Sequence, residues 1–147
     1  MTEQQQPVFN IEKIYVKDLS LEIPHAPAIF LEREQPQIDM QLHNEATRID
    51  EGYFEASITI TVTAKLGDKT MFLAEATQAG IFQIRNVPAE DMDPVLGIGC
   101  PNILFPYVRE TISDMVNRSG FPPVILSPIN FEALYAQKQA ADAGQAQ

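Results

Sequence analysis

The segment FEASITITVTAKL, residues Phe54 to Leu66, decides the fold class of this chain. Apolar and polar side chains alternate along its whole length. The residues that share the apolar side are Phe54, Ala56, Ile58, Ile60, Val62, Ala64 and Leu66. Successive side chains of a β-strand point to opposite faces of the sheet. The segment is therefore predicted to be a long strand of an antiparallel sheet that has one buried face and one solvated face.

Three other segments are predicted strands of the same sheet. Residues 8–21 are rich in β-branched and aromatic residues, and residues 38–42 alternate between apolar and polar. The Gly-Asp pair at 67–68 suits a tight turn, after which residues 69–84 return as a further strand. Prolines within and just after residues 23–35 exclude a regular strand there. That stretch is predicted to be a long connection, and long ordered connections are often functional.

The second half of the chain is predicted to be helical. Apolar residues recur at spacings of three and four from Asn102 or Phe105 until Gly120, which suits a helix end. Pro106 is expected in the first turn of this helix, where a proline costs no hydrogen bond. Because strands precede helices, the fold class is predicted to be α+β. We expect a four-stranded antiparallel sheet followed by one long and one short helix, with the helices packed on one face of the sheet.

A short last helix is predicted to begin after Asn130, whose side chain can cap it. Three of its residues share one face, namely Phe131, Leu134 and Tyr135. The final stretch AQKQAADAGQAQ is low in complexity and is predicted to be disordered. The expected organisation is a mobile N-terminal lead-in, a single domain and a disordered tail, at residues 1–7, 8–136 and 137–147.

The composition excludes several classes of function. Twenty acidic residues against ten basic ones give a net charge of -10, which disfavours binding to nucleic acid or to an anionic membrane surface. The single cysteine cannot form a disulfide within the chain, and this fits a reducing compartment. No window reaches the roughly 20 apolar residues of a membrane-spanning helix, and the N-terminus lacks the pattern of a signal peptide. We therefore expect a cytoplasmic protein that does not insert into membranes.

The sequence carries no recognisable catalytic or metal-binding motif. It lacks the glycine-rich motifs that cradle nucleotide phosphates. His25 and His43 are its only histidines, and no spacing typical of a metal site joins them to each other or to the cysteine. Cys100 is either a buried small hydrophobe or the nucleophile of a thiol enzyme, but no general base can be assigned to it. We predict a binding protein rather than an enzyme, without a cofactor.

Two polar strand faces and three apolar segments are the candidate binding features. Strand alternation places Asp18, Ser20 and Glu22 on one side of the first strand. The same rule places Leu73, Glu75 and Thr77 on one side of the fourth strand, which is expected to be its solvated side. A leucine beside a carboxylate on such a face suits a basic, partly apolar partner, but the pattern alone favours ordinary surface alternation. Apolar side chains at residues 29–31, at 121–126 and on the last helix are hard to bury in one small domain. They predict either a core closed by oligomerisation or a groove for apolar segments.

Four blocks of the sequence together resemble one protein family. KDLSLEIPHAP, LGDKTMFLAEATQAGIF, GCPNILFPYVRE and SPINFEALY occur in this order within residues 8–136. They resemble the SecB protein-export chaperone family, and the third block is the most specific. The resemblance implies a homotetramer built as a dimer of dimers, with the long helices sandwiched between the sheets. It also implies an ATP-independent chaperone that holds newly made preproteins unfolded and delivers them to the SecA ATPase.

The resemblance also assigns roles to particular positions. The surface that receives the zinc-binding C-terminal tail of SecA would consist of Asp18, Glu22, Leu73 and Glu75, and the zinc would belong to SecA. Contacts between dimers would involve Ala74, Ala76 and Gln78, with Tyr107 and Ile112 as further candidates on the long helix. Candidates for client binding are Phe30, Phe131, Leu134 and Tyr135. Two alternatives remain, a SecB-like chaperone of a toxin–antitoxin system and a thiol enzyme that uses Cys100.

Overall fold

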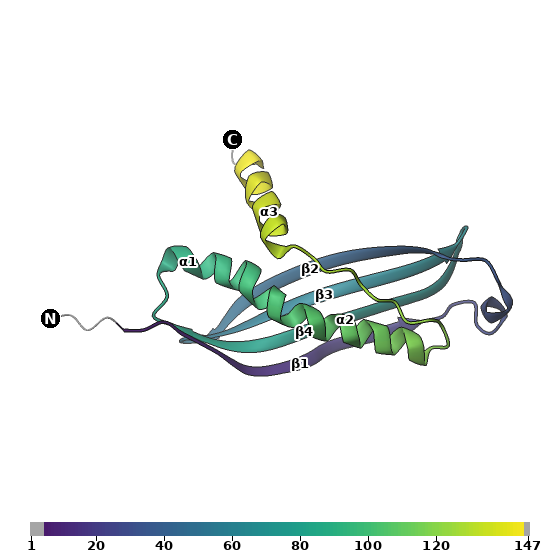
Figure 1. Ribbon diagram of the computed structural model, residues 1–147, viewed down its shortest axis with the longest axis horizontal. Helices are drawn as coiled ribbons and strands as arrows, with labels where there is room; N and C mark the ends of the chain where they lie inside the picture. The colour runs from purple at the N-terminus through teal and green to yellow at the C-terminus, as the bar shows by residue number, and fades with distance from the viewer. Residues whose placement is uncertain (1–4, 146–147) are drawn as a thin grey trace.

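One four-stranded antiparallel sheet forms the body of the protein (Figure 1). The computed structural model describes residues 5–145, so residues 1–4 of the predicted lead-in at 1–7 lie outside the described residues. The strand order is β1-β4-β3-β2, and every neighbouring pair is antiparallel. The strands are β1 (Val8–Glu22), β2 (Gln37–Asp50), β3 (Tyr53–Leu66) and β4 (Lys69–Arg85). The predicted fold class is confirmed.

The alternation of β3 and β4 produces the two faces of the sheet. The even-numbered residues of β3 from Ala56 to Ala64 are almost completely buried, whereas Thr59, Thr61 and Thr63 stay partly exposed on the other face. Burying one large aliphatic side chain stabilises a fold by about 1.5–3 kcal/mol, so a continuous apolar row strongly determines the register. β2 is longer than the predicted segment 38–42. Its second half lacks apolar alternation because it forms an edge of the sheet and is mostly exposed there.

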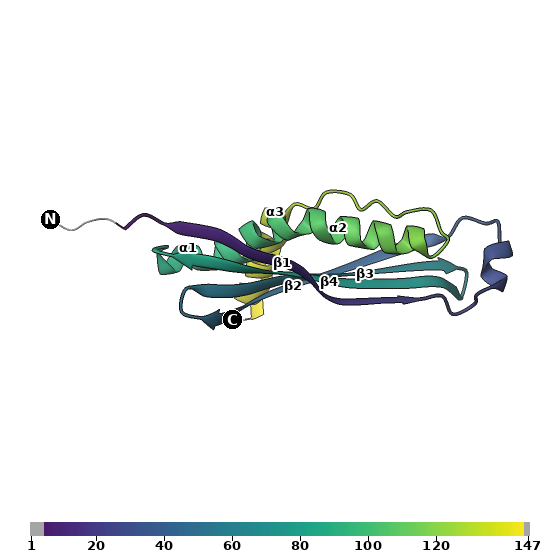
Figure 2. The same cartoon turned by 90° about the horizontal axis from the view of Figure 1, so that it is seen from below.

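A continuous helical segment covers the buried face of the sheet (Figure 2). It consists of α1 (Ala89–Pro94), the π-helical turn η2 (Val95–Gly99) and α2 (Cys100–Arg118). The predicted start near residue 102 or 105 was therefore too late. Pro106 lies inside α2 and not in its first turn. The reason is that Pro106 is on the exposed side of the helix, where water can satisfy the backbone carbonyl that loses its partner.

The apolar side of α2 closes the core. Its fully buried large aliphatic side chains are Leu104, Val108, Ile112 and Val116. After α2 the chain runs back alongside this helix in extended form, and Figure 1 shows it leading to α3 (Phe131–Gln145) beside the β2 edge. Among the helices that the structure describes, none is long and apolar enough to cross a membrane.

The last helix differs from the prediction in two respects. It extends to Gln145, so residues 137–145 are helical and not disordered, while 146–147 lie outside the described residues. The alanine, glutamine and lysine residues that make this stretch low in complexity also have high helix propensity. In addition, α3 does not cover the sheet. It contacts η2, and beyond that contact it points away from the body (Figure 1).

Candidate binding surfaces

An apolar groove lies at the end of the sheet where the connection between β1 and β2 approaches the segment that follows α2. Its volume is about 530 Å³. We call it the aromatic groove, and its apolar lining residues are Ile29, Phe30, Pro36, Ile38, Met71, Phe72, Phe121, Pro122, Pro123 and Val124. Glu32, Glu34 and Gln35 add a polar rim. The groove therefore combines an apolar wall with an acidic border, which suits an apolar chain segment.

Three phenylalanine rings form a stack inside the aromatic groove. The Phe30 and Phe121 rings are stacked, with centroids 5.0 Å apart and planes inclined by 24°. The Phe72 ring is tilted by 35° against Phe121, again with 5.0 Å between centroids. These separations are typical of favourable aromatic pairs. Phe72 and Phe121 are buried at 2% and 8% exposure, whereas Phe30 is 45% exposed. The stack thus leads from the core to the solvent.

Local backbone structure presents Phe30 to the groove. The 3₁₀ turn η1 (Ala28–Leu31) is closed by hydrogen bonds from the Phe30 amide to the carbonyl of Pro27 at 3.1 Å and from the Glu32 amide to the carbonyl of Ile29 at 3.2 Å. Ile29 is buried and anchors the turn, so that the next residue points into the groove. On the opposite wall Gly120 has φ +97°, and a Cβ atom there would lie 3.1 Å from the Phe30 ring. Glycine therefore allows both the turn after α2 and the close approach of the ring.

Only one of the four predicted client-binding residues lines this groove. Phe30 does, whereas Phe131 is buried and packs edge-on against Phe105, with ring centroids 5.9 Å apart. Phe131 points inward because α3 starts at the end of the helix layer. Phe131 is therefore mainly a core residue, although it also borders a second hollow beside Leu134 and Tyr135, and its contact with clients stays a prediction.

Leu134 and Tyr135 lie at a second hollow between α3, η2 and β2. Leu134 is 40% exposed there. The Tyr135 hydroxyl donates to Asp93 Oδ2 at 2.7 Å, and a Cβ atom at Gly97 would lie 2.9 Å from the tyrosine ring. The hydrogen bond to Asp93 raises the pKa of Tyr135. Tyr135 therefore fastens α3 to the body, while the Leu134 side chain remains accessible.

The residues that complete the aromatic groove were recognisable only in part. The apolar run 121–126 was noted as hard to bury, but Phe121 was not chosen from it. Phe72 belongs to the buried side of β4 by alternation, and nothing in the local sequence shows that its ring borders a groove. The missing information is tertiary, because β4 and the segment after α2 are about 50 residues apart in the chain.

The four residues predicted to receive SecA lie together on the open face of the sheet. In the register of β1 with β4, Glu22 is opposite Leu73 and Ser20 is opposite Glu75. Asp18 is opposite Thr77, which is on the same side of β4 as Glu75. Opposite residues of an antiparallel pair point to the same face. Thr61 of β3 donates a 2.7 Å hydrogen bond to Glu75, which holds that carboxylate in place. We call Asp18, Glu22, Leu73 and Glu75 the acidic face.

Four of the five predicted contacts between protomers are buried within this protomer. Ala74, Ala76, Gln78 and Ile112 are between 0% and 4% exposed. Strand alternation places the first three on the side opposite to Leu73 and Glu75, beneath α2, where the Thr111 hydroxyl donates to Gln78 at 3.1 Å. Ala74, Ala76 and Ile112 have no exposed surface for a second protomer, so their prediction as direct contacts is corrected, whereas Gln78 borders a shallow hollow beside Tyr107 and stays a candidate. Tyr107 is 50% exposed on α2 and remains a candidate.

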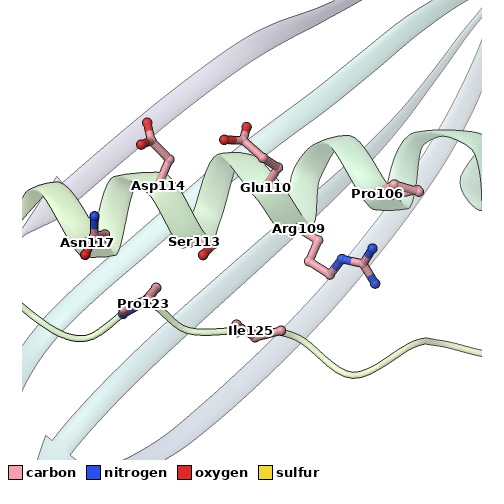
Figure 3. A pocket seen from close by; sticks show the side chains of 8 residues that line it. All are labelled: Pro106, Arg109, Glu110, Ser113, Asp114, Asn117, Pro123 and Ile125. Atoms are coloured by element: carbon pink, nitrogen blue, oxygen red, sulfur yellow. The ribbon is translucent and has the colours of Figure 1, made fainter.

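The outer surface of α2 is polar and open. A shallow hollow of about 490 Å³ separates it from the extended segment that returns toward α3. Figure 3 shows Glu110 and Asp114 pointing to one side of the helix and Arg109 to the other, with Ile125 on the returning segment. Ile125 is 79% exposed. Polar side chains that surround an exposed aliphatic group suit contact with another protein surface.

The structure gives no support to catalysis by Cys100. The thiol is fully buried, and desolvation raises its pKa to about 12. A nucleophilic cysteine needs a thiolate near neutral pH, and here the thiol stays protonated. Among residues 5–145, no group of three or more His, Cys, Asp or Glu side chains is arranged to hold a metal ion.

Comparison with known proteins gives consistent matches over nearly the whole chain. Residues 2–142 match the family described as preprotein translocase subunit SecB. The chain is 66% identical to the protein-export protein SecB of Chromobacterium violaceum, over 99% of this chain and 100% of that protein. It is 62% identical to the protein of the same name from Thiobacillus denitrificans, over 99% and 96% of the two chains.

A similar fold is found in a solved structure of a distant protein. It is a SecB-like chaperone of Mycobacterium tuberculosis, in complex with a peptide from the HigA1 antitoxin. The TM-score is 0.68 at 17% identity, and the match covers 82% of this chain and 90% of the other.

Proposed function

The chain belongs to the SecB family of protein-export chaperones, and we propose that it holds unfolded preproteins through the aromatic groove. The observation that carries this proposal is the stack of Phe30, Phe121 and Phe72, of which the outermost ring is 45% exposed. An apolar or aromatic client side chain that covers the Phe30 ring removes apolar surface from water. The ring is already held by its neighbours, so the chaperone loses little conformational entropy on binding. Contact of this kind needs no nucleotide.

Weak contacts at several grooves are sufficient for this task. A disordered client loses conformational entropy at each bound segment, so the affinity of one groove for one segment is low. Grooves joined in one assembly raise the effective concentration of the remaining segments and give avidity without a sequence motif. Because the chaperone binds the unfolded state, it opposes folding of the client by mass action.

A refolding assay tests the groove. The protein in excess should retard the refolding of a slow-folding client in the absence of nucleotide. Phe30→Ala should weaken this effect about threefold to tenfold, because part of the exposed apolar wall is lost. Leu31→Ala is the matched control, since Leu31 is the next residue, is 83% exposed and does not line the groove. Equal loss in both variants, or no retardation by the wild type, would contradict the proposal.

We also propose that the acidic face docks the zinc-binding tail of the SecA ATPase in the cytoplasm. Asp18, Glu22 and Glu75 lie beside Leu73 on the sheet face opposite to α2, and this arrangement supports a basic and partly apolar partner. Glu75→Lys should weaken SecA binding at least tenfold at low salt, while retardation of client refolding persists. Glu132→Lys on α3 makes the same charge change away from the sheet and should bind SecA normally. Equal affinity of the Glu75→Lys variant and the wild type would refute this assignment.

The assembly proposed for this function is a homotetramer built as a dimer of dimers. The exposed outer surface of α2, with Tyr107 and Ile125, supports a contact between protomers on the helix side. Native mass measured at several concentrations, with and without an unfolded client, tests the assembly. Tyr107→Ala should shift the mass distribution toward dimers, and an unchanged distribution would exclude Tyr107 from the interface.

A further inference from the structure

A single carboxylate connects α3 to the body of the protein by hydrogen bonds. Asp93, in the last turn of α1, accepts at Oδ2 from the Tyr135 hydroxyl at 2.7 Å and from the side-chain amide of Gln139 at 3.2 Å. Tyr135 and Gln139 are one helical turn apart and lie on the same face of α3. Among the side chains that the structure describes, no other hydrogen bond or ion pair joins α3 to the strands or to the other helices.

Gly97 provides the space that this connection needs. It lies in η2, and a Cβ atom at this residue would be 2.9 Å from the Tyr135 ring. Gly97 is not among the glycines with a positive φ, so its backbone conformation would accept an alanine. Gly99, also in η2, would place its added Cβ in open space, with no atom within 4 Å. Only one of the two glycines of η2 is therefore required by the contact with α3.

The first turn of α3 is anchored separately from the rest of the helix. Phe131 is 3% exposed and packs against Phe105 of α2. The Asn130 side chain caps the helix by accepting a 3.0 Å hydrogen bond from a backbone amide of the first turn. Residues 136–143 are all exposed. A helix of this length is marginal in water without tertiary contacts, so the hydrogen bonds to Asp93 determine how firmly this part is held.

The position of α3 determines one wall of the second hollow. This hollow has a volume of about 460 Å³ and lies between residues 43–46 of β2, Leu96 and Gly97 of η2, and α3. Leu134, at 40% exposure, contributes an apolar side chain from α3. It is the neighbour of Tyr135 in the chain. A wall that is already ordered loses less conformational entropy when a ligand covers it, so Leu134 can serve as a wall while α3 stays against η2.

We propose that Asp93 is a positioning residue that holds α3 against η2, so that Leu134 forms a wall of the second hollow and contacts unfolded clients there. The inference rests on the proposed holding of preproteins, for which Leu134 is a predicted contact. Asp93 acts through Tyr135, and the absence of a side chain at Gly97 lets the tyrosine ring reach it. Removal of the carboxylate, or of this space, frees the helix beyond its first turn and displaces the wall.

Proteolysis under native conditions tests whether Asp93 holds α3. A lysine-specific protease cuts after Lys138 when α3 opens locally, and Lys69 at the turn between β3 and β4 is the internal reference. Asp93→Ala should speed cleavage at Lys138 about tenfold and leave cleavage at Lys69 unchanged. Gly97→Ala should have the same effect, because the added Cβ displaces the tyrosine ring, whereas Gly99→Ala should behave like the wild type. Unchanged cleavage at Lys138 in either of the first two variants would overturn the proposal.

The conservative variant Asp93→Asn separates position from charge. The asparagine side chain keeps an oxygen that can accept the tyrosine hydroxyl. Cleavage at Lys138 and affinity for an unfolded client should therefore stay close to those of the wild type. If Asp93→Asn is as defective as Asp93→Ala, the charge and not the hydrogen bond is required, and the positioning role is refuted.

A double-mutant cycle tests the link to client binding. Affinity for an unfolded client is measured for the wild type, Asp93→Ala, Leu134→Ala and the double variant. Each single change should weaken binding about threefold, and the double variant should bind no more weakly than either, because both changes remove the same wall. Additive losses would show that Asp93 does not act through Leu134, and would overturn the proposal.

The same measurements separate this proposal from the function on which it rests. If Leu134→Ala weakens client binding and Asp93→Ala does not, only the positioning role of Asp93 is refuted. If neither Phe30→Ala nor Leu134→Ala weakens client binding, the proposed client contacts fail, and proteolysis alone decides whether Asp93 holds α3.

Discussion

The aromatic groove and the acidic face are built in opposite ways. The acidic face consists of side chains on two neighbouring strands, and alternation along each strand brings them together. The aromatic groove joins a 3₁₀ turn, a strand residue and a loop after a helix, which come from distant parts of the chain. A site on one sheet face follows from a local rule, whereas a groove between loops depends on the whole fold. The first site should therefore tolerate substitution better than the second.

The largest expected difference between the two sites concerns stability. Phe72 is 2% exposed and belongs both to the core and to the aromatic groove. Phe72→Ala should lower the free energy of unfolding by about 3–5 kcal/mol, because it removes a buried ring and leaves a cavity. Glu75→Gln on the acidic face should change it by less than about 1 kcal/mol. Urea unfolding of both variants checks this, and similar losses would remove the distinction.

Gly120 tests how far the groove depends on backbone conformation. At φ +97° an alanine is strained, and its Cβ would press on the Phe30 ring. Gly120→Ala should cost about 1–2 kcal/mol of stability and should reduce the retardation of client refolding. Gly67→Ala is a suitable control, because φ is +58° there but no atom lies within 4 Å of the added Cβ. Its expected result is a similar loss of stability with normal client binding.

Ionic strength should change binding at the acidic face but not binding in the aromatic groove. Raising the ionic strength from about 0.05 M to about 0.5 M should weaken SecA binding about threefold to tenfold, since the docking carboxylates are exposed and screened. Client binding in the aromatic groove should change little, because apolar burial is not screened. Titrations of SecA and of an unfolded client across this range measure both effects. Parallel weakening of both partners would show that the groove also acts by charge.

The smallest expected effect is the pH dependence of stability that arises from the ion pair between Lys17 of β1 and Glu55 of β3, whose Nζ and Oε1 atoms are 2.8 Å apart. The folded state lowers the pKa of Glu55, chiefly through its hydrogen bond from Lys17. The contribution to stability is therefore present above the pKa of the unfolded chain and is lost as the pH falls through the lowered folded value. The stability difference between the wild type and Glu55→Gln should be larger at about pH 7 than at about pH 3. An unchanged difference, measured by urea unfolding, would show that the ion pair contributes nothing.

Several features could be read from the amino-acid sequence because the physics behind them is local. Strict period two in residues 54–66 determined which side chains of β3 face the core. The same rule placed Leu73 and Glu75 on the open face. The structure buries Ala74, Ala76 and Gln78 on the opposite side of β4, whereas the resemblance pointed to contacts between protomers.

Other features depend on contacts that no local pattern describes. The start of the long helix was predicted too late because prolines and glycines between residues 88 and 101 weaken its helical signal. The second half of β2 was missed because pairing with β3, and not its own composition, makes it a strand. Phe131 was assigned to a surface because its burial requires Phe105 of another helix.

The amino-acid sequence by itself determined the α+β class, the two faces of the sheet, the acidic face and the family. Each of these four features follows from alternation along a strand or from residue identity, and these two kinds of information require no knowledge of distant contacts. Tertiary structure alone decided the aromatic groove, the position of α3 and the ion pair of Lys17 with Glu55. The contacting residues in these three features are 38 or more positions apart in the chain, so only the folded arrangement brings them together.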